Sequence, residues 1–213
     1  GTSIELTASG GISYAWSGPN GYTSADQNPV ITNGMATSGG TYQVTVTDAN
    51  NCTSSSSINV VVNNPPTATV ASNSPVCVGT SIALTASGGI SYTWSGPNGY
   101  TSIDQNPVIT NVQTTSSGAY QVTVTDAQSC TNTASILVSV LPKPFAIISS
   151  NSPVCIGSDL RLQLSGGISY LWSGPLNFSS ITQNPIISGS TTANSGVYQA
   201  IVTGQNGCTT TVT

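Results

Sequence analysis

Apolar and polar residues alternate along several short stretches of this chain. The alternation is regular over residues 3–8, 81–86 and 159–164, where Glu5 and Arg161 fall among the polar positions. A period of two is typical of a half-buried β-strand, because successive side chains point to opposite faces of a sheet. We therefore predict three strands whose apolar side faces a core and whose polar side faces solvent.

All three stretches belong to a repeat, which is marked by a longer motif. The motif Gly-Gly-Ile-Ser-Tyr-x-Trp-Ser-Gly-Pro occurs at residues 10–19, 88–97 and 166–175. The tryptophans of the chain are therefore 78 residues apart (94 − 16 and 172 − 94): Trp16, Trp94 and Trp172. A fixed period makes each repeat one structural unit. We predict a first repeat over 1–64, a complete middle repeat over 65–142 and a third repeat over 143–213.

The middle repeat shows about seven short strands separated by turn signals, the spacing of a β-sandwich. Tyr92 and Trp94 share one face of the strand after Gly88-Gly89, and residues 108–112 form another predicted strand. No stretch has helical periodicity. The chain is thus predicted to be all-β, with tandem antiparallel sandwiches. The aromatic core markers are Trp16, Tyr42, Trp94, Tyr120, Trp172 and Tyr198.

Charged residues are scarce, and their scarcity excludes several classes of function. Only 4% of residues are charged, and Lys143 and Arg161 are the two basic residues. Binding to nucleic acid or to an anionic membrane needs clustered basic residues, so neither is expected, and no apolar run is long enough to span a membrane. Histidine is absent, and the six acidic residues form no paired acid and base. We expect a protein that is not an enzyme and that holds no metal or cofactor.

The ends of the repeats suggest how they are connected. Proline-bearing linkers at 63–66 and 141–144 favour extended, semi-rigid joints, which predicts a rod. The first repeat lacks an opening strand, and the third stops before residues equivalent to 136–140. Either the chain is a piece of a longer array, or a neighbouring chain supplies the missing strand at the open sheet edge.

The middle repeat resembles immunoglobulin-like domains. Residues 79–86 resemble strand B, Trp94 the core tryptophan of strand C, and residues 109–122 the segment from strand E to the tyrosine corner. The resemblance covers most of each repeat and implies a β-sandwich. It departs at Ala86 and Val122, which stand where antibody domains place their inter-sheet cysteines.

The cysteines recur with the repeat, one early and one late in each. Cys77 and Cys155 are the early cysteines, and the late ones are Cys52, Cys130 and Cys208. This pattern predicts a disulfide framework formed in an oxidising compartment. A Cys-x-Gly before strand B and a Cys-bearing turn after strand F are similar to the tandem repeats of giant secreted surface proteins of gliding Bacteroidetes. That resemblance implies export to the cell surface and a role as adhesin stalk or filament.

Two disulfide pairings remain open. Cys77 with Cys130 closes a loop of roughly 50 residues within one repeat, worth about 4 kcal/mol in the chain-entropy model. On an immunoglobulin template, however, these two loops lie at opposite ends, and head-to-tail stacking would instead bring Cys77 near Cys208. We favour the pairing within the repeat because both cysteines of a complete repeat are then paired with each other. The partner of Cys52 would lie outside these residues.

The partners expected from this reading are neighbouring repeats of the same chain, other copies in a filament, and surface glycans. Three aromatic residues follow the Pro-Asn-Gly turn: Tyr22, Tyr100 and Phe178. The favoured interpretation is that these rings cover the edge of their own sandwich; the alternative is contact with a glycan, because a ring on a loop can stack on a sugar. A glycan-binding array and a spacer within a secreted hydrolase are the two rival functions to a stalk.

Overall fold

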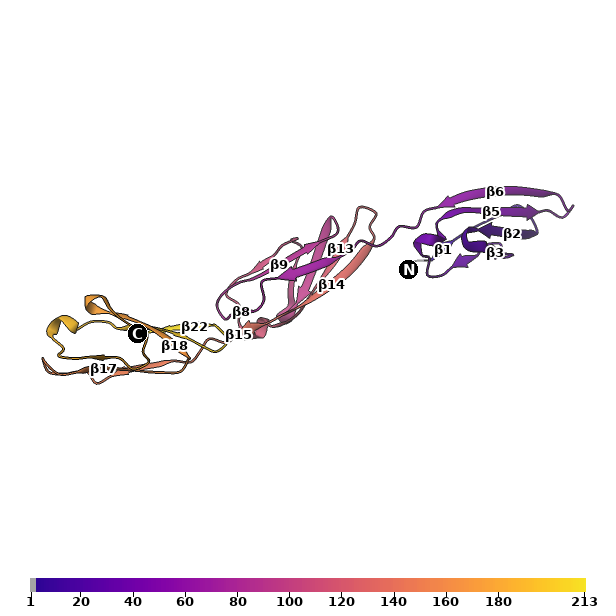
Figure 1. Ribbon diagram of the computed structural model, residues 1–213. Helices are drawn as coiled ribbons and strands as arrows, with labels where there is room; N and C mark the ends of the chain where they lie inside the picture. The colour runs from indigo at the N-terminus through magenta and orange to yellow at the C-terminus, as the bar shows by residue number, and fades with distance from the viewer. Residues whose placement is uncertain (1–2) are drawn as a thin grey trace. The chain divides into compact units, whose positions relative to one another are not determined.

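The structure, a computed structural model, describes residues 3–213 as a chain of short β-strands (Figure 1). Over these residues there is no α-helix, and single 3-10 turns stand between some of the strands. The chain divides into two compact units: one comprises Gly1–Ala68, Gly88–Ser91 and Thr123–Thr133, and the other Thr69–Ser87, Tyr92–Val122 and Ala134–Thr213. The repeat boundaries at 64/65 and 142/143 stay a prediction.

Two sheets form in the first repeat. β1 (Ile4–Glu5) pairs antiparallel with β4 (Val30–Ile31). The second sheet has the order β3-β2-β5-β6. Its strands are β2 (Ser13–Gly18), β3 (Tyr22–Ser24), β5 (Gly40–Thr47) and β6 (Thr53–Val60).

The strands of the middle repeat form two sheets and a short parallel pair, with orders β12-β9-β7, β11-β10-β13-β14 and β15-β8. They are β7 (Thr69–Ser72), β8 (Val76–Cys77), β9 (Ile82–Ser87), β10 (Ser91–Gly96), β11 (Tyr100–Ser102), β12 (Val108–Ile109), β13 (Gly118–Thr125), β14 (Thr131–Val138) and β15 (Val140–Leu141). In immunoglobulin lettering these orders are E-B-A, C′-C-F-G and G-A′. The predicted immunoglobulin-like sandwich is confirmed.

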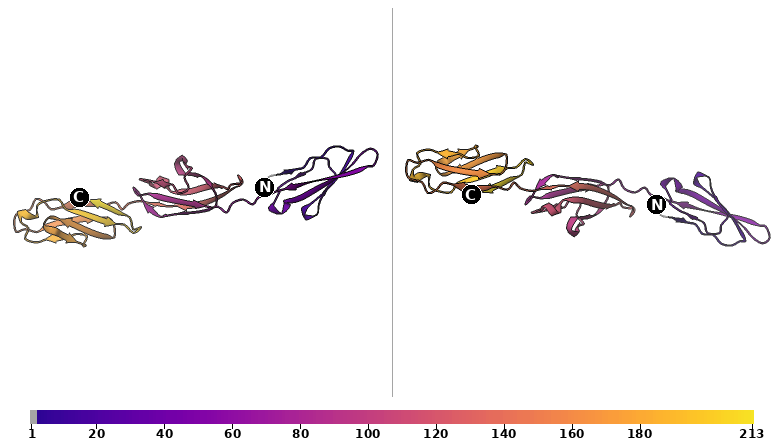
Figure 2. Two further views of the ribbon diagram at one scale, coloured as in Figure 1. Left: turned by 90° about the horizontal axis from the view of Figure 1, so that it is seen from above. Right: turned by 90° about the horizontal axis from the view of Figure 1, so that it is seen from below.

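Most of this arrangement recurs in the third repeat. Its sheets have the orders β16-β17-β20 and β19-β18-β21-β22. The strands are β16 (Ile147–Ser150), β17 (Leu160–Ser165), β18 (Ser169–Gly174), β19 (Phe178–Ser180), β20 (Ile186–Ile187), β21 (Gln199–Thr203) and β22 (Thr209–Val212). The strands of this repeat can be followed in Figure 2. Within the described part of this repeat, no strand corresponds to β8 or β15.

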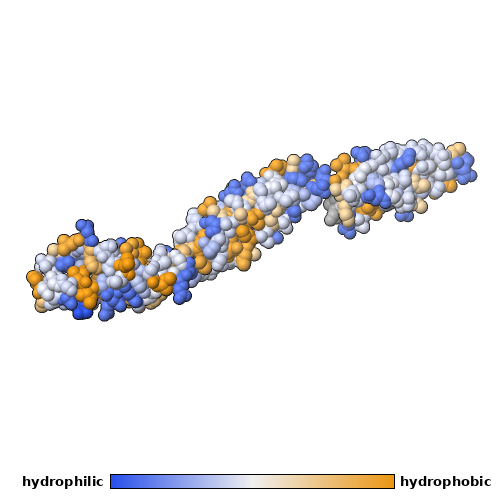
Figure 3. Space-filling view, in the orientation of Figure 1, coloured by the Kyte–Doolittle hydropathy of each residue, from blue (hydrophilic) through white to orange (hydrophobic). Residues whose placement is uncertain are grey.

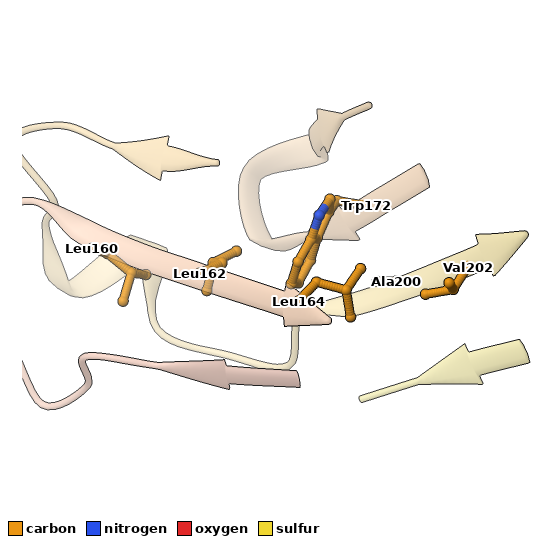
Figure 4. Packing of buried hydrophobic residues seen from close by; sticks show 6 residues of the cluster. All are labelled: Leu160, Leu162, Leu164, Trp172, Ala200 and Val202. Carbon is orange, nitrogen blue, oxygen red and sulfur yellow. The ribbon is translucent and has the colours of Figure 1, made fainter. Parts of the chain in front are cut away.

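The alternating residues form the cores, as the pattern predicted. Ile82 and Leu84 of β9 are fully buried, whereas Glu5 of β1 and Arg161 of β17 are exposed. In the third repeat the leucines of β17 pack with residues of β18 and β21, as Figure 4 shows: Leu160, Leu162, Leu164, Trp172, Ala200 and Val202. Burial of these apolar side chains is the main force that holds each sandwich together.

Each tryptophan is fixed by one hydrogen bond besides its burial. The indole Nε1 donates to the main-chain oxygen of the residue ten positions later, at 3.1 Å for Asp26, 2.9 Å for Asp104 and 3.1 Å for Thr182. Because the acceptor is a main-chain oxygen, the aspartate side chain is not needed for this bond. This explains why threonine stands at the same position in the third repeat.

A tyrosine corner is present in all three repeats. The hydroxyl donates to the main-chain oxygen four residues earlier, from Tyr42 to Ser38 at 2.8 Å, Tyr120 to Ser116 at 3.0 Å and Tyr198 to Asn194 at 2.9 Å. The ring lies directly over a glycine of the neighbouring strand. A Cβ at Gly96 would lie 2.5 Å from a ring carbon of Tyr120, which is why glycine precedes the proline at the end of the repeated motif.

Buried tyrosines should make the fold sensitive to alkali. Burial, the larger cause, and the nearby Tyr100 raise the pKa of Tyr120 above its ordinary 10.0; burial also raises the pKa of Tyr42 and of Tyr198. A tyrosine whose pKa is raised by folding stabilises the folded state fully below its unfolded pKa. That stabilisation is lost as the pH rises through the folded pKa. We expect the melting temperature to fall as the pH rises above 10.0, the ordinary tyrosine pKa.

The measurement is thermal unfolding at a series of pH values, with the free thiols first blocked by iodoacetamide so that thiolate chemistry does not contribute. A variant with phenylalanine at all three corners is the control, and its melting temperature should depend less on pH over the same range. An equal fall in melting temperature at alkaline pH in both proteins would contradict the prediction.

Two predicted strands are shorter than expected. The segment predicted as a strand over 3–8 forms β1 only at Ile4–Glu5. The segment predicted as a strand over 108–112 forms β12 only at Val108–Ile109. The strand stops because Asn111 takes a positive φ of 53°, a conformation that asparagine tolerates better than most residues. Asn33 does the same in the first repeat, with a φ of 55°.

The surface carries scattered apolar residues among polar ones (Figure 3). Ile12, Ile90 and Ile168, which follow the paired glycines, are examples of exposed apolar residues. Single exposed apolar residues are normal on soluble domains. Within residues 3–213, no helix has the length and apolar character to cross a membrane.

Candidate functional site

The site with the clearest built-in chemistry is a disulfide between two repeats. Cys77 of β8 is bonded to Cys208, which lies in the turn before β22, with the two Cα atoms 5.7 Å apart and a sequence separation of 131. That Cα separation lies within the usual range for disulfides. The bond therefore joins the early cysteine of the middle repeat to the late cysteine of the third.

Strand pairing brings Cys77 to the exit of the middle repeat. β8 and β15 pair in parallel with Leu141 opposite Cys77, and the chain leaves the repeat directly after Leu141. The linker then stays beside the turn of Cys208. Asn206 Nδ2 donates to the Pro142 oxygen at 2.8 Å, and Cys208 Sγ lies 3.9 Å from the Leu141 oxygen.

This geometry corrects the favoured pairing of Cys77 with Cys130, which was wrong. Cys130 lies in the turn between β13 and β14, and next to it Asn132 Nδ2 donates to the Pro66 oxygen at 2.9 Å. Cys130 is thus beside the entry to the middle repeat, whereas Cys77 is at its exit. Two cysteines per repeat can all be paired either within one repeat or between consecutive repeats. The number of cysteines therefore could not distinguish these two pairings.

Three cysteines are free, two of them exposed and Cys130 half-buried: Cys52, Cys130 and Cys155. The turns of the late cysteines are built alike. The main-chain N–H of Cys52 donates to Asp48 Oδ1 at 2.9 Å, and that of Cys130 to Asp126 Oδ1 at 2.8 Å. These aspartates therefore brace the turns of the late cysteines. In the third repeat Asn206 Oδ1 accepts from Cys208 N at 3.1 Å and replaces the aspartate.

The aromatic residues after the turn lie against the tyrosine corners. The rings of Tyr22 and Tyr42 are 5.5 Å apart, those of Tyr100 and Tyr120 5.6 Å, and those of Phe178 and Tyr198 5.5 Å, each pair edge to face. Each of the three turn rings is half-buried. A packed ring of this kind covers the edge of its own sandwich, and its contact with a glycan stays a prediction.

Replacing one turn ring separates its two possible roles. We expect Tyr100→Ala to destabilise the middle repeat by more than about 0.5–1.5 kcal/mol, the value of an aromatic pair beyond its buried area. Tyr100→Phe keeps the ring and is the matched control. Urea denaturation measures the stability, and a glycan array measures binding. Unchanged stability together with lost glycan binding would contradict the packing role.

Other clusters of functional groups are sparse. The described residues contain no group of three or more cysteine, aspartate or glutamate side chains placed to hold a metal ion. Asp159 and Arg161 form an exposed ion pair at 3.2 Å. An exposed pair of this kind contributes little to stability.

Comparison with known proteins gives likenesses of fold. No protein-family model matches the chain, and no curated protein matches it by sequence. Among solved structures, the amphioxus IgVJ-C2 molecule is 20% identical with a TM-score of 0.33, over 65% of this chain and 97% of that one.

Two further structures are similar over 99% of this chain. Three N-terminal domains of the bacteriophage RB49 Highly Immunogenic Outer Capsid protein are 14% identical over 92% of that chain, with a TM-score of 0.39. A 1.5-MDa bacterial ice-binding adhesin, in a study of its retention on the host cell surface, is 13% identical over 88% of that chain, with a TM-score of 0.40. At such identities a likeness concerns the fold alone.

Proposed function

We propose that this chain is a structural segment of an extracellular repeat array, without enzymatic activity, in which disulfides connect consecutive sandwiches. The array would form the stalk or filament of a large cell-surface adhesin, such as those that the cysteine pattern resembles in gliding Bacteroidetes. The observation that carries the proposal is the bond between Cys77 and Cys208, because it links two repeats that are also joined by a short prolyl linker.

The chemistry of this bond supports a location outside the cytosol. Disulfides form and persist in oxidising compartments and are rare where glutathione keeps thiols reduced. The polar surface, built from serine, threonine and asparagine with few charges, agrees with that location. A bond at the joint between repeats limits how far the joint opens, which suits a segment that transmits force.

Immunogold labelling of intact cells of the source organism tests the proposal. An antibody against this chain should label material that extends from the cell surface, and negative-stain images of the native protein should show rods or filaments. Labelling confined to permeabilised cells would overturn the proposal. The same experiment, repeated after digestion with an external protease, should lose its signal.

A further inference from the structure

The third repeat carries an unfilled groove beside Cys155. The groove has a volume of about 320 Å³ and is bordered by residues that include Ser152, Val154, Cys155, Leu160 and Ser195. Cys155 and Ser195 are exposed there, whereas Cys77 and Ser117, which are equivalent to them, are half-buried. We name this feature the strand groove.

In the middle repeat the equivalent space is filled by residues 139–141. Val76 N donates to Ser139 O at 3.1 Å, and Val78 N donates to Leu141 O at 2.9 Å. Serine side chains complete the attachment: Ser139 N donates to Ser74 Oγ at 2.8 Å and Val140 N to Ser117 Oγ at 2.9 Å. Val140 is buried as a result.

Every group that makes these bonds has a counterpart in the strand groove. Ser152 corresponds to Ser74, Ser195 to Ser117, and the main-chain N–H groups of Val154 and Ile156 to those of Val76 and Val78. Ile156 is 75% exposed. The groove therefore presents the same donors and acceptors, in the same order, to an additional strand.

The loop of Cys155 is also held in the same way as the loop of Cys77, although it carries no disulfide. Gly79 N donates to Val112 O at 2.8 Å, and Gly157 N to Ser190 O at 2.8 Å. The side chain of Asn73 bridges to Ser81 O at 3.0 Å, and that of Asn151 to Asp159 O at 3.1 Å. The loop is thus formed before any partner binds.

We infer that the strand groove and Cys155 together form a docking site for a strand of this repeat type and for the repeat that follows that strand. A segment with the sequence pattern of residues 136–141 fills the groove as a parallel strand, and the late cysteine of the repeat after it bonds to Cys155. The middle repeat specifies the occupant, because residues 139–141 fill its equivalent groove and its Cys77 is bonded to the late cysteine of the next repeat. The inference rests on the proposed function and names the partner of one of its surfaces.

The bond forms by oxidation of two thiols. Cys155 and the late cysteine each give up one proton and one electron as the S–S bond forms. Oxidised glutathione accepts both electrons and both protons and leaves as two molecules of reduced glutathione. The reaction therefore balances with a disulfide oxidant of the kind that oxidising compartments supply.

Two lengthened forms of the full chain test the inference. In the strand form, a copy of residues 136–141 follows Thr213, which aligns with Ser135 (213 − 135 = 78). Amide exchange at Val154 and Ile156 should become slower than in the unextended chain, and the free thiols should remain three, as now. In the repeat form, a copy of residues 136–213 follows Thr213 and adds two cysteines.

After oxidation with glutathione disulfide, the repeat form should still have three free thiols, the number in the present chain, because Cys155 and the added late cysteine are consumed. Five free thiols would overturn the inference. Peptide mapping should join Cys155 to the copy of Cys208. Cys155→Ser should raise the count by one and remove that cross-link, whereas the matched control Cys130→Ser should lower the count by one and keep it.

The strand form tests whether such a strand fills the groove even if the repeat form does not fold. Unchanged exchange at Val154 and Ile156 would overturn the groove assignment. Exchange that slows as the concentration of the unextended chain rises would show that a second copy fills the groove, and would overturn the assignment of a strand from the same chain. None of these outcomes depends on surface labelling, so the inference and the proposed function can fail separately.

Discussion

Under mechanical load, the reduced protein is expected to extend about 430–470 Å further than the oxidised protein. The bond between Cys77 and Cys208 spans 131 residues of chain, and a fully extended chain gains about 3.3–3.6 Å per residue. While the bond is intact, unfolding of the middle and third repeats cannot release this length. The bond therefore sets the reach of the unfolded chain independently of how stable each sandwich is.

Single-molecule force spectroscopy, with the chain held at its two ends, measures this length. Cys77→Ser should extend like the reduced protein with or without reductant. Cys130→Ser is the matched control, because it removes a cysteine that is free and should leave the length of the oxidised protein unchanged. Equal extension of the oxidised protein and of Cys77→Ser would contradict the assigned bond.

The sequence predicted the cores well because burial follows local alternation. The buried faces of β9 and β17 and the exposed positions of Glu5 and Arg161 all follow from a period of two. The core tryptophans were found from their recurrence, and the tyrosine corner from its resemblance to that of immunoglobulin-like domains. Strand ends were predicted less well, since β12 stops where the backbone of Asn111 turns to positive φ, and pattern alone does not place that turn.

The disulfide could not be derived from the cysteine count. Its location depends on the parallel register that sets Leu141 opposite Cys77, and on the hydrogen bond from Asn206 to Pro142. Both involve segments far apart in sequence. The strand groove was missed for a related reason: the missing last strand was noticed in the sequence, but the serines that bind its equivalent became recognisable only in the structure.

Removal of the core tryptophan of the middle repeat should have the largest effect on stability. Trp94 is fully buried and donates a hydrogen bond to the Asp104 oxygen at 2.9 Å. We expect Trp94→Ala to lower the free energy of unfolding of that repeat by about 3–5 kcal/mol, the usual cost of deleting a large buried aromatic side chain. Ile90→Ala removes an exposed apolar side chain from the neighbouring turn and should change stability by less than about 0.5 kcal/mol.

Amide hydrogen exchange measures this effect repeat by repeat. Trp94→Ala should speed exchange in β13, and Trp172→Ala should speed exchange in β21 while β13 keeps its protection. That contrast follows if each sandwich has its own core, since mutations at distant sites act independently. Loss of protection in both strands from either substitution would show that the two repeats unfold together, and that the boundary predicted at 142/143 does not separate two cooperative units.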